Sequence, residues 1–296
     1  MNPLKKRITV AVLCMSTCVA PFFLSGCSLS NVTDSVQQDL QKPQQDQGEV
    51  FNRYVKAINT FNDRSLTFAY ANTPALENLK NGRHLTVFSS PDFKHLNEDL
   101  QEAKKVGVPY PDMNEPLDKV LAVLHDIVPL TEELNAYYDA KTYTTDNYAK
   151  EQQLGAKYIQ LYEQFQAVYP ALNDIIHKHN MELQKEQLQK MKDAGQKNTA
   201  AVQEIHLRLT DIVDGLEGNK PVDANAINQE LQVIADLSAT VSNTEYDRAR
   251  RELNQSIGAI RTFISDQNEK NYSNMIKAYN DFIDEINNLD MRKLDK

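Results

Sequence analysis

The chain has 296 residues, of which 41 are acidic and 32 are basic, so its formal net charge is −9. This acidic balance argues against a protein that binds nucleic acid or an anionic lipid surface, because both need clustered lysine and arginine. With nine glycines and no tryptophan, and rich in glutamine, asparagine, leucine, alanine and lysine, the composition favours helices over strands.

The first 26 residues are predicted to be a secretory signal peptide. A basic segment, Lys5-Lys6-Arg7, precedes an uncharged apolar run over residues 8–24, and small residues follow it. A transmembrane helix would need about 20 apolar residues. Pro21 and the small residues that follow would end such a helix early.

The apolar run ends in Leu24-Ser25-Gly26-Cys27, which resembles the lipobox of bacterial lipoproteins. The resemblance implies cleavage between Gly26 and Cys27, a diacylglycerol on the Cys27 thiol and acylation of the new N-terminus. It places the rest of the chain on the extracytoplasmic side, held by lipid to the cell membrane or the outer membrane. Ser28 after the cysteine favours the outer membrane if the cell is Gram-negative. Each buried CH₂ contributes about 0.8 kcal/mol, so two or three acyl chains are a stable anchor.

The three cysteines, Cys14, Cys18 and Cys27, all lie in the signal peptide or at its cleavage site. The mature chain would therefore keep only the lipidated Cys27. We expect no disulfide and no thiolate for zinc or nucleophilic chemistry. Loss of three basic residues with the signal peptide would leave 29 basic against 41 acidic side chains, a net charge of 29 − 41 = −12.

The mature chain is predicted to begin with a disordered tether over residues 27–48, which are polar, rich in glutamine and poor in apolar side chains. A helical-bundle domain then covers residues 49–296. Its first helix is expected from Glu49 to about Tyr70, where apolar residues recur at helical spacing. They include Phe51, Tyr54, Ile58, Phe61, Leu66 and Phe68.

The region that follows is less regular. Leu85-Thr86-Val87-Phe88 could form a short extended piece, and Ser90-Pro91 is predicted to cap a helix that ends at Gly107. A strong helix begins at Asn114-Glu115-Pro116, and Pro129 inside it predicts a kink.

Thr145-Asp146 is predicted to cap a helix with the longest apolar seam of the chain. The seam alternates spacings of four and three, as in a coiled coil, and its phase continues through Pro170. Its residues are Leu154, Tyr158, Leu161, Phe165, Val168, Leu172, Ile175 and His179. Residues 177–200 are mostly polar, so we expect an exposed arm there.

Three further stretches complete the predicted bundle. They are an apolar stripe over residues 202–216, a shorter helix capped by Asp223, and a last long stretch from Thr244 to Leu289. No segment alternates apolar and polar residues for long enough to make a sheet. The predicted fold class is all-α: a bundle of long antiparallel helices behind a disordered N-terminal tether.

Several short motifs resemble the YiiG-like bacterial lipoproteins, which carry a domain of unknown function behind a lipobox. The motifs are Tyr54 with Asn59, Tyr137-Tyr138 followed by Tyr143, Tyr148 and Ala149-Lys150, and the closing Tyr279-Asn280. The resemblance covers about residues 49–289, although Glu151-Gln152-Gln153 replaces the small or basic residues expected after Lys150. It implies a helical extracytoplasmic lipoprotein and no particular activity.

Seven of the thirteen tyrosines lie between Tyr137 and Tyr169. Aromatic residues at helical spacing usually belong to the core, with their hydroxyls at its wet edge. The alternative is a ligand groove, in which exposed rings stack on a glycan or a peptide. The residues predicted to line such a groove are Tyr137, Tyr138, Tyr143 and Tyr148.

The remaining polar residues predict no metal site, cofactor or catalytic residue. Asp174 and His177 have the i, i+3 spacing of half a bundle metal site, but the second half is missing. His177 and His179 point apart on a helix. The phosphate-binding, serine-hydrolase and zinc-protease motifs are also missing from the sequence.

We therefore expect a non-enzymatic, lipid-anchored protein that binds or scaffolds something at the cell envelope. Its partners would be the membrane, through the lipid on Cys27, and an envelope protein or glycan, with no nucleic acid. The alternative is a small-ligand or glycan-binding module that uses the tyrosines. An envelope hydrolase is a more distant third.

Overall fold

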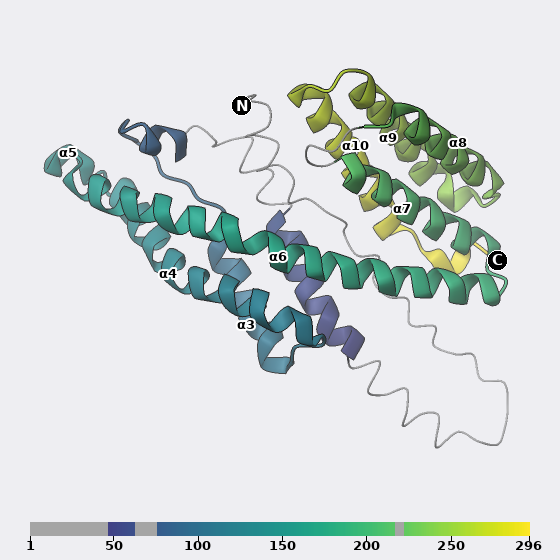
Figure 1. The fold of residues 1–296 in the computed structure, drawn as a ribbon, viewed down its shortest axis with the longest axis horizontal. Coiled ribbons are helices and arrows are strands. Elements are labelled where there is room, and N and C mark those ends of the chain that lie inside the picture. Colours follow the sequence, from purple (N-terminus) through teal and green to yellow (C-terminus); the bar gives the residue numbers. More distant parts are fainter. Residues whose placement is uncertain (1–46, 63–75, 217–221) are drawn as a thin grey trace, which may run out of the picture. The chain divides into compact units, whose positions relative to one another are not determined.

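The computed structural model of the chain describes residues 47–62, 76–216 and 222–296 (Figure 1). Across these ranges every regular element is a helix and none is a strand, which confirms the predicted all-α class. None of the helices in the described ranges combines the length and the apolar character needed to cross a membrane. The predicted signal peptide, the residues that resemble a lipobox, and residues 27–46 of the predicted tether lie outside the described residues.

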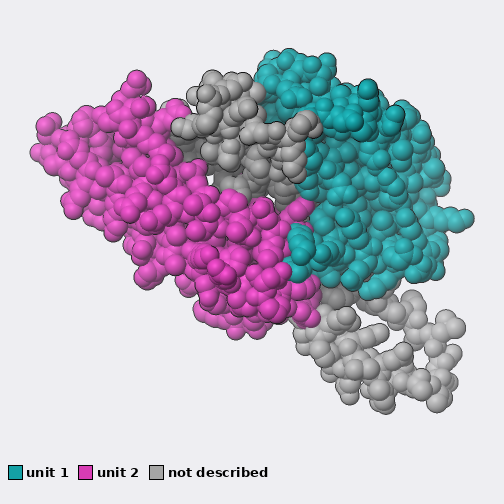
Figure 2. Space-filling view, viewed as in Figure 1, with its two compact units in different colours: residues 1–24, 178–296 teal, residues 25–177 magenta. Residues whose placement is uncertain are grey.

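The chain divides into two compact units (Figure 2). Among the described residues, unit 2 comprises residues 47–62 and 76–177, and unit 1 comprises residues 178–216 and 222–296. The 45-residue helix α6 (Ala149–Asp193) contributes its first part to unit 2 and its last turns to unit 1.

The first described element of unit 2 is a helix over residues 47–62, which includes the last two residues of the predicted tether. Phe51, Tyr54, Ile58 and Phe61 are all buried on it, as their spacing predicts. Leu66 and Phe68 lie outside the described residues. The ring of Phe61 lies 5.6 Å from that of Phe165 and 5.3 Å from that of Tyr169, so this helix packs on α6.

The next helical segments are a short turn over residues 76–80 and α3 (Phe93–Val106). The predicted cap at Ser90 is wrong by two residues, because the side chain of Asp92 accepts the hydrogen bond from the His95 N–H. Gly107 ends α3 as predicted. The stretch over residues 85–88 is irregular rather than a strand, with Leu85 and Phe88 buried.

After a 3₁₀ turn, η1 (Pro111–Met113), α4 (Asn114–Asp139) begins at the predicted residue. Helix α4 continues through Pro129, as α6 does through Pro170. The kink at Pro129 stays a prediction. The four-residue helix α5 (Tyr143–Asp146) then joins α4 to α6. The α4–α5–α6 connection is where the predicted tyrosine cluster lies.

The seam of α6 is correct at five of its eight predicted positions. Leu154, Tyr158, Leu161, Phe165 and Leu172 are buried, and Tyr169 and Ile176 are buried one position after the predicted Val168 and Ile175. Val168, Ile175 and His179 are only partly buried. A straight helix has 3.6 residues per turn, so a strict 3.5-residue pattern drifts off its face by about 20° per heptad.

Unit 1 contains the last part of α6, then α7 (Lys197–Leu216) and α8 (Ala224–Thr240). Much of the predicted exposed arm is exposed, but it is not free of the bundle, because Asn180, Gln184 and Met191 are buried there and α6 ends at a turn through Gly195. Gln203 of α7 donates from Nε2 to Gln184 Oε1 at 3.3 Å. Polar side chains thus face a neighbouring helix, which composition alone does not reveal.

The last predicted stretch is two helices rather than one. Following the 3₁₀ turn η2 (Thr244–Tyr246), α9 (Asp247–Ser265) and α10 (Glu269–Asn288) pack against each other as a hairpin. Asn268 caps α10 by accepting the Asn271 N–H at 2.8 Å. Asn243, rather than Thr244, provides the earlier cap, whereas Asp223 caps α8 as predicted. A final turn, η3 (Met291–Lys293), follows α10.

Candidate functional site

The α4–α5–α6 connection has an unusual backbone. Lys141, Asn147 and Tyr148 have φ angles of 52°, 51° and 63°, in the left-handed region. Asparagine tolerates this region, but for a residue such as tyrosine it costs about 1–2 kcal/mol. Strained backbone of this kind gathers at ligand-binding and catalytic sites, so the connection is a candidate for function.

Asp146 holds the connection together. Its carboxylate accepts hydrogen bonds from the N–H groups of Tyr148 at 3.0 Å and Lys150 at 3.1 Å, which confirms its predicted role as a cap for α6. The Tyr137 hydroxyl also donates to it at 2.9 Å. Desolvation alone would raise the pKa of Asp146, but these hydrogen bonds outweigh it and hold the pKa below its usual value. Burial, reinforced by Asp146, raises the pKa of Tyr137 to about 12.

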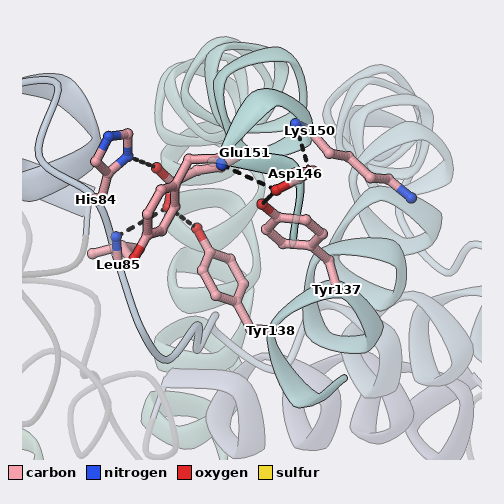
Figure 3. A network of polar contacts seen from close by, with 8 residues as sticks. His84, Leu85, Tyr137, Tyr138, Asp146, Lys150 and Glu151 are labelled. Atoms are coloured by element: carbon pink, nitrogen blue, oxygen red, sulfur yellow. Dashed lines mark hydrogen bonds and ion pairs between the residues drawn. The ribbon is translucent and has the colours of Figure 1, made fainter. Parts of the chain in front are cut away.

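Glu151, in the first turn of α6, lies at the centre of a second network (Figure 3). Its side chain is only 4% exposed. Oε2 accepts hydrogen bonds from the Leu85 N–H at 3.0 Å and from the Tyr138 hydroxyl, while Oε1 lies 2.5 Å from His84 Nδ1. Burial and the contact with Glu151 raise the pKa of Tyr138 well above its usual value.

Three rings stack beside this carboxylate. His84 lies on Tyr148 with ring centroids 3.9 Å apart and planes 15° from parallel. The other stacking neighbour of Tyr148 is Tyr143, at 5.3 Å and 16°. Tyr137 and Tyr138 contact Tyr143 edge-on or tilted, at 6.4 Å and 6.0 Å. The strained backbone at Tyr148 therefore places its ring in stacking contact with both a histidine and a second tyrosine.

The structure brings the four predicted tyrosines together but buries two of them. Tyr137 and Tyr138 are each 3% exposed, which contradicts the exposure that the groove hypothesis assumed for them. Their hydroxyls are instead used inside the protein, by Asp146 and Glu151. Tyr143 and Tyr148 are partly exposed. Any ligand contact through this cluster would therefore use the Tyr143–Tyr148 side.

Sequence reasoning missed His84 and Glu151. Glu151 follows a recognisable cap, but nothing local distinguishes it from a solvated first-turn carboxylate. His84 lies 67 residues before it, in an irregular segment without periodicity. The predicted lipidation and cleavage residues, Gly26 and Cys27, lie outside the described residues.

Other parts of the described chain are weaker candidates for a functional site. Among residues 47–62, 76–216 and 222–296 no group of three or more histidine, cysteine or acidic side chains is placed to hold a metal ion. A groove of about 380 Å³ between α4 and α6 is lined by Pro129, Glu133, Lys150 and Leu154, with Lys150 paired to Glu133 at 2.8 Å. In unit 1 a hollow of about 800 Å³ adjoins the start of α7, whose N–H groups the chain's own Asp295 caps.

The chain was compared with protein families, curated proteins and solved structures. No curated protein and no solved structure matches it. The family described as "Protein of unknown function (DUF3829)" matches residues 48–266. The match starts at the first described helix and ends just before α10, so it includes the complete α4–α5–α6 connection. The chain therefore belongs to the DUF3829 family of proteins of unknown function.

Proposed function

We propose that this protein is a lipid-anchored lipoprotein of the extracytoplasmic side, related to the YiiG-like lipoproteins, that binds or scaffolds a partner at the cell envelope. The observation that carries the proposal is Leu24-Ser25-Gly26-Cys27 behind a basic and then apolar N-terminal run. The role proposed is binding rather than catalysis, with the cell membrane or outer membrane as the site of the anchor.

Two further properties of the sequence support this location. Cysteine is confined to positions 14, 18 and 27, so the folded part carries no thiol that an oxidising compartment would cross-link. The charge of −12 after cleavage suits a solvated domain that stands away from anionic headgroups. Two or three acyl chains on one cysteine are sufficient to hold a protein of this size at a bilayer.

The anchor is tested by labelling cells that express the full chain with radioactive palmitate. We expect label in the wild type and loss of label and of membrane fractionation in Cys27→Ala. Cys18→Ala is the matched control, because this cysteine lies in the segment that cleavage removes, and it should keep the label. Label that persists in Cys27→Ala would exclude the lipoprotein assignment.

A second candidate function, a ligand-binding module at the tyrosine cluster, is favoured by one specific observation. The partly exposed rings of Tyr143 and Tyr148 are stacked, and a strained backbone holds Tyr148 in place. Such a fixed aromatic pair is suited to stacking on a ligand. The candidate is compatible with the anchor, since a lipoprotein can hold a binding site at the envelope.

A further inference from the structure

The buried Glu151 carboxylate has a histidine as its basic partner. The Glu151 side chain is 4% exposed, whereas the His84 side chain is 47% exposed. The lysine next to Glu151 along the chain, Lys150, pairs instead with Glu133 at 2.8 Å. Within the described ranges, the hydrogen-bond partner at Glu151 Oε1 is thus a half-exposed imidazole from an irregular segment.

His84 makes two contacts at once. Its ring lies flat on Tyr148, and its Nδ1 faces Glu151 Oε1 at 2.5 Å. Stacking on an aromatic face and hydrogen bonding to a carboxylate are the two means by which proteins hold planar nitrogen cations such as guanidinium. The His84 ring therefore makes the same two contacts with Tyr148 and Glu151 that a bound guanidinium would make.

We propose that Tyr148 and Glu151 form a binding site for a planar nitrogen cation of the guanidinium or imidazolium class, at the position that the ring of the chain's own His84 takes in this structure. The proposal rests on the ligand-binding candidate above and names its ligand class. A carboxylate at the centre of the site disfavours anions. The Oε1 atom that His84 faces favours a ligand that combines a flat face with an N–H donor, as a guanidinium or an imidazolium does.

The rest of the site stays in place when His84 leaves. Leu85 N–H and the Tyr138 hydroxyl bind Oε2, so Oε1 remains aimed at the vacated position. Leu85 and Phe88 are buried and anchor the segment, with Phe88 5.0 Å from the ring of Tyr158. A rotation of the exposed His84 side chain therefore opens the site without unfolding the segment. Such preorganisation lowers the cost of binding.

The test is a titration of the full chain, in detergent, with agmatine and with imidazole. Tyrosine fluorescence reports binding, because the chain has no tryptophan to mask it. His84→Ala removes the competing ring and should bind agmatine about tenfold more tightly than the wild type, the gain expected when the site is free about a tenth of the time. Free imidazole should also bind His84→Ala. Glu151→Gln should lose binding in either background, whereas Glu163→Gln, an exposed carboxylate on the same helix, should keep it.

A capped tripeptide with a central arginine distinguishes the source of the cation. Tighter binding of the tripeptide than of agmatine would indicate an arginine side chain of a partner, and the reverse a free guanidino compound. Either result supports the site. If His84→Ala fails to fold, the assigned His84 ring signal in NMR spectra of the wild type gives the answer, because agmatine must shift it.

Two outcomes would overturn the proposal. One is that neither agmatine nor imidazole binds His84→Ala or, where that variant does not fold, that agmatine leaves the His84 signal of the wild type unchanged. The other is binding that survives Glu151→Gln. A glycan that bound the tyrosine cluster while agmatine did not would overturn the cation site and leave the ligand-binding candidate standing. Palmitate labelling reports on the anchor separately.

Discussion

At the scale of single residues, Glu151 stands out in unit 2 because its carboxylate is buried. Burying an ionised carboxylate costs several kcal/mol unless hydrogen bonds and a partner charge compensate. Its donors come from two parts of the chain besides its own helix: Tyr138 belongs to α4, and His84 and Leu85 belong to the irregular segment. One side chain therefore fastens that segment to the α4–α6 pair.

We predict that Glu151→Gln lowers the free energy of unfolding by about 1–3 kcal/mol, because the amide cannot accept from all three donors. Glu163→Gln is the matched control on the same helix. Its carboxylate is exposed and pairs with Lys80, so the loss should stay below about 1 kcal/mol. Urea midpoints of the two variants measure the difference. Equal midpoints would mean that the network contributes nothing specific.

The same residues mark the limit of prediction from sequence. Asp146 was predictable as a cap, because a cap acts on the N–H groups two to four residues after it. Glu151 was not, since its partner His84 is brought to it only by the tertiary fold. For the tyrosines, the sequence indicated a cluster, but burial of Tyr137 and Tyr138 depends on which acceptors lie opposite their hydroxyls.

At the scale of helices, apolar spacing predicted each long helix well and their ends less well. The partial exposure of Val168 and Ile175 in α6 and the break between α9 and α10 have different causes. The first comes from the geometry of a straight helix, which a heptad pattern ignores. The second comes from a local cap at Asn268, which competes with continuation of the helix.

Phe165 lies where the predicted seam and the observed core agree. Its ring is 5.0 Å from Phe93 and 5.6 Å from Phe61. We predict that Phe165→Ala costs about 3–5 kcal/mol, from lost burial and the cavity left behind. Gln164→Ala, an exposed neighbour, should change stability by less than about 0.5 kcal/mol. Denaturant unfolding compares them, and a mild Phe165→Ala would mean that this ring is not core.

A charge network links three helices of unit 1. Glu204 of α7 lies 2.7 Å from Lys192 of α6, and Arg208 joins it at 2.7 Å and reaches Glu230 of α8 at 2.5 Å. The hydrogen bond from Lys192, opposed by burial and aided by Arg208, lowers the pKa of Glu204. A lowered pKa in the folded state means that the stabilisation is complete above the ordinary glutamate pKa of about 4.3 and is lost as pH falls below it.

We therefore predict that Glu204→Gln is less stable than the wild type by about 1 kcal/mol at neutral pH, an estimate that allows for the exposure of its partners. At pH 3 the difference should shrink towards zero, because protonation removes the charge from Glu204 itself. Guanidine would screen the charges, so urea unfolding at the two pH values is the measurement. A difference that stays constant with pH would assign the effect to packing rather than to charge.

At the scale of the whole molecule, the account combines two compact units with the lipid anchor that we propose at Cys27. Unit 2 contains the strained connection and the buried carboxylate that could hold a ligand. Unit 1 contains the α9–α10 hairpin and the charge network. Both would be attached to the membrane through one residue, Cys27, so the location of the whole protein depends on chemistry at a single sulfur atom.

Mass spectrometry of the N-terminal peptide, from protein purified out of the membrane fraction, tests this central claim most directly. The account predicts a peptide that begins at Cys27, lacks residues 1–26 and carries a diacylglycerol in thioether linkage to the cysteine sulfur. A peptide that begins at Met1, or one in which Cys27 has a free thiol, would contradict it.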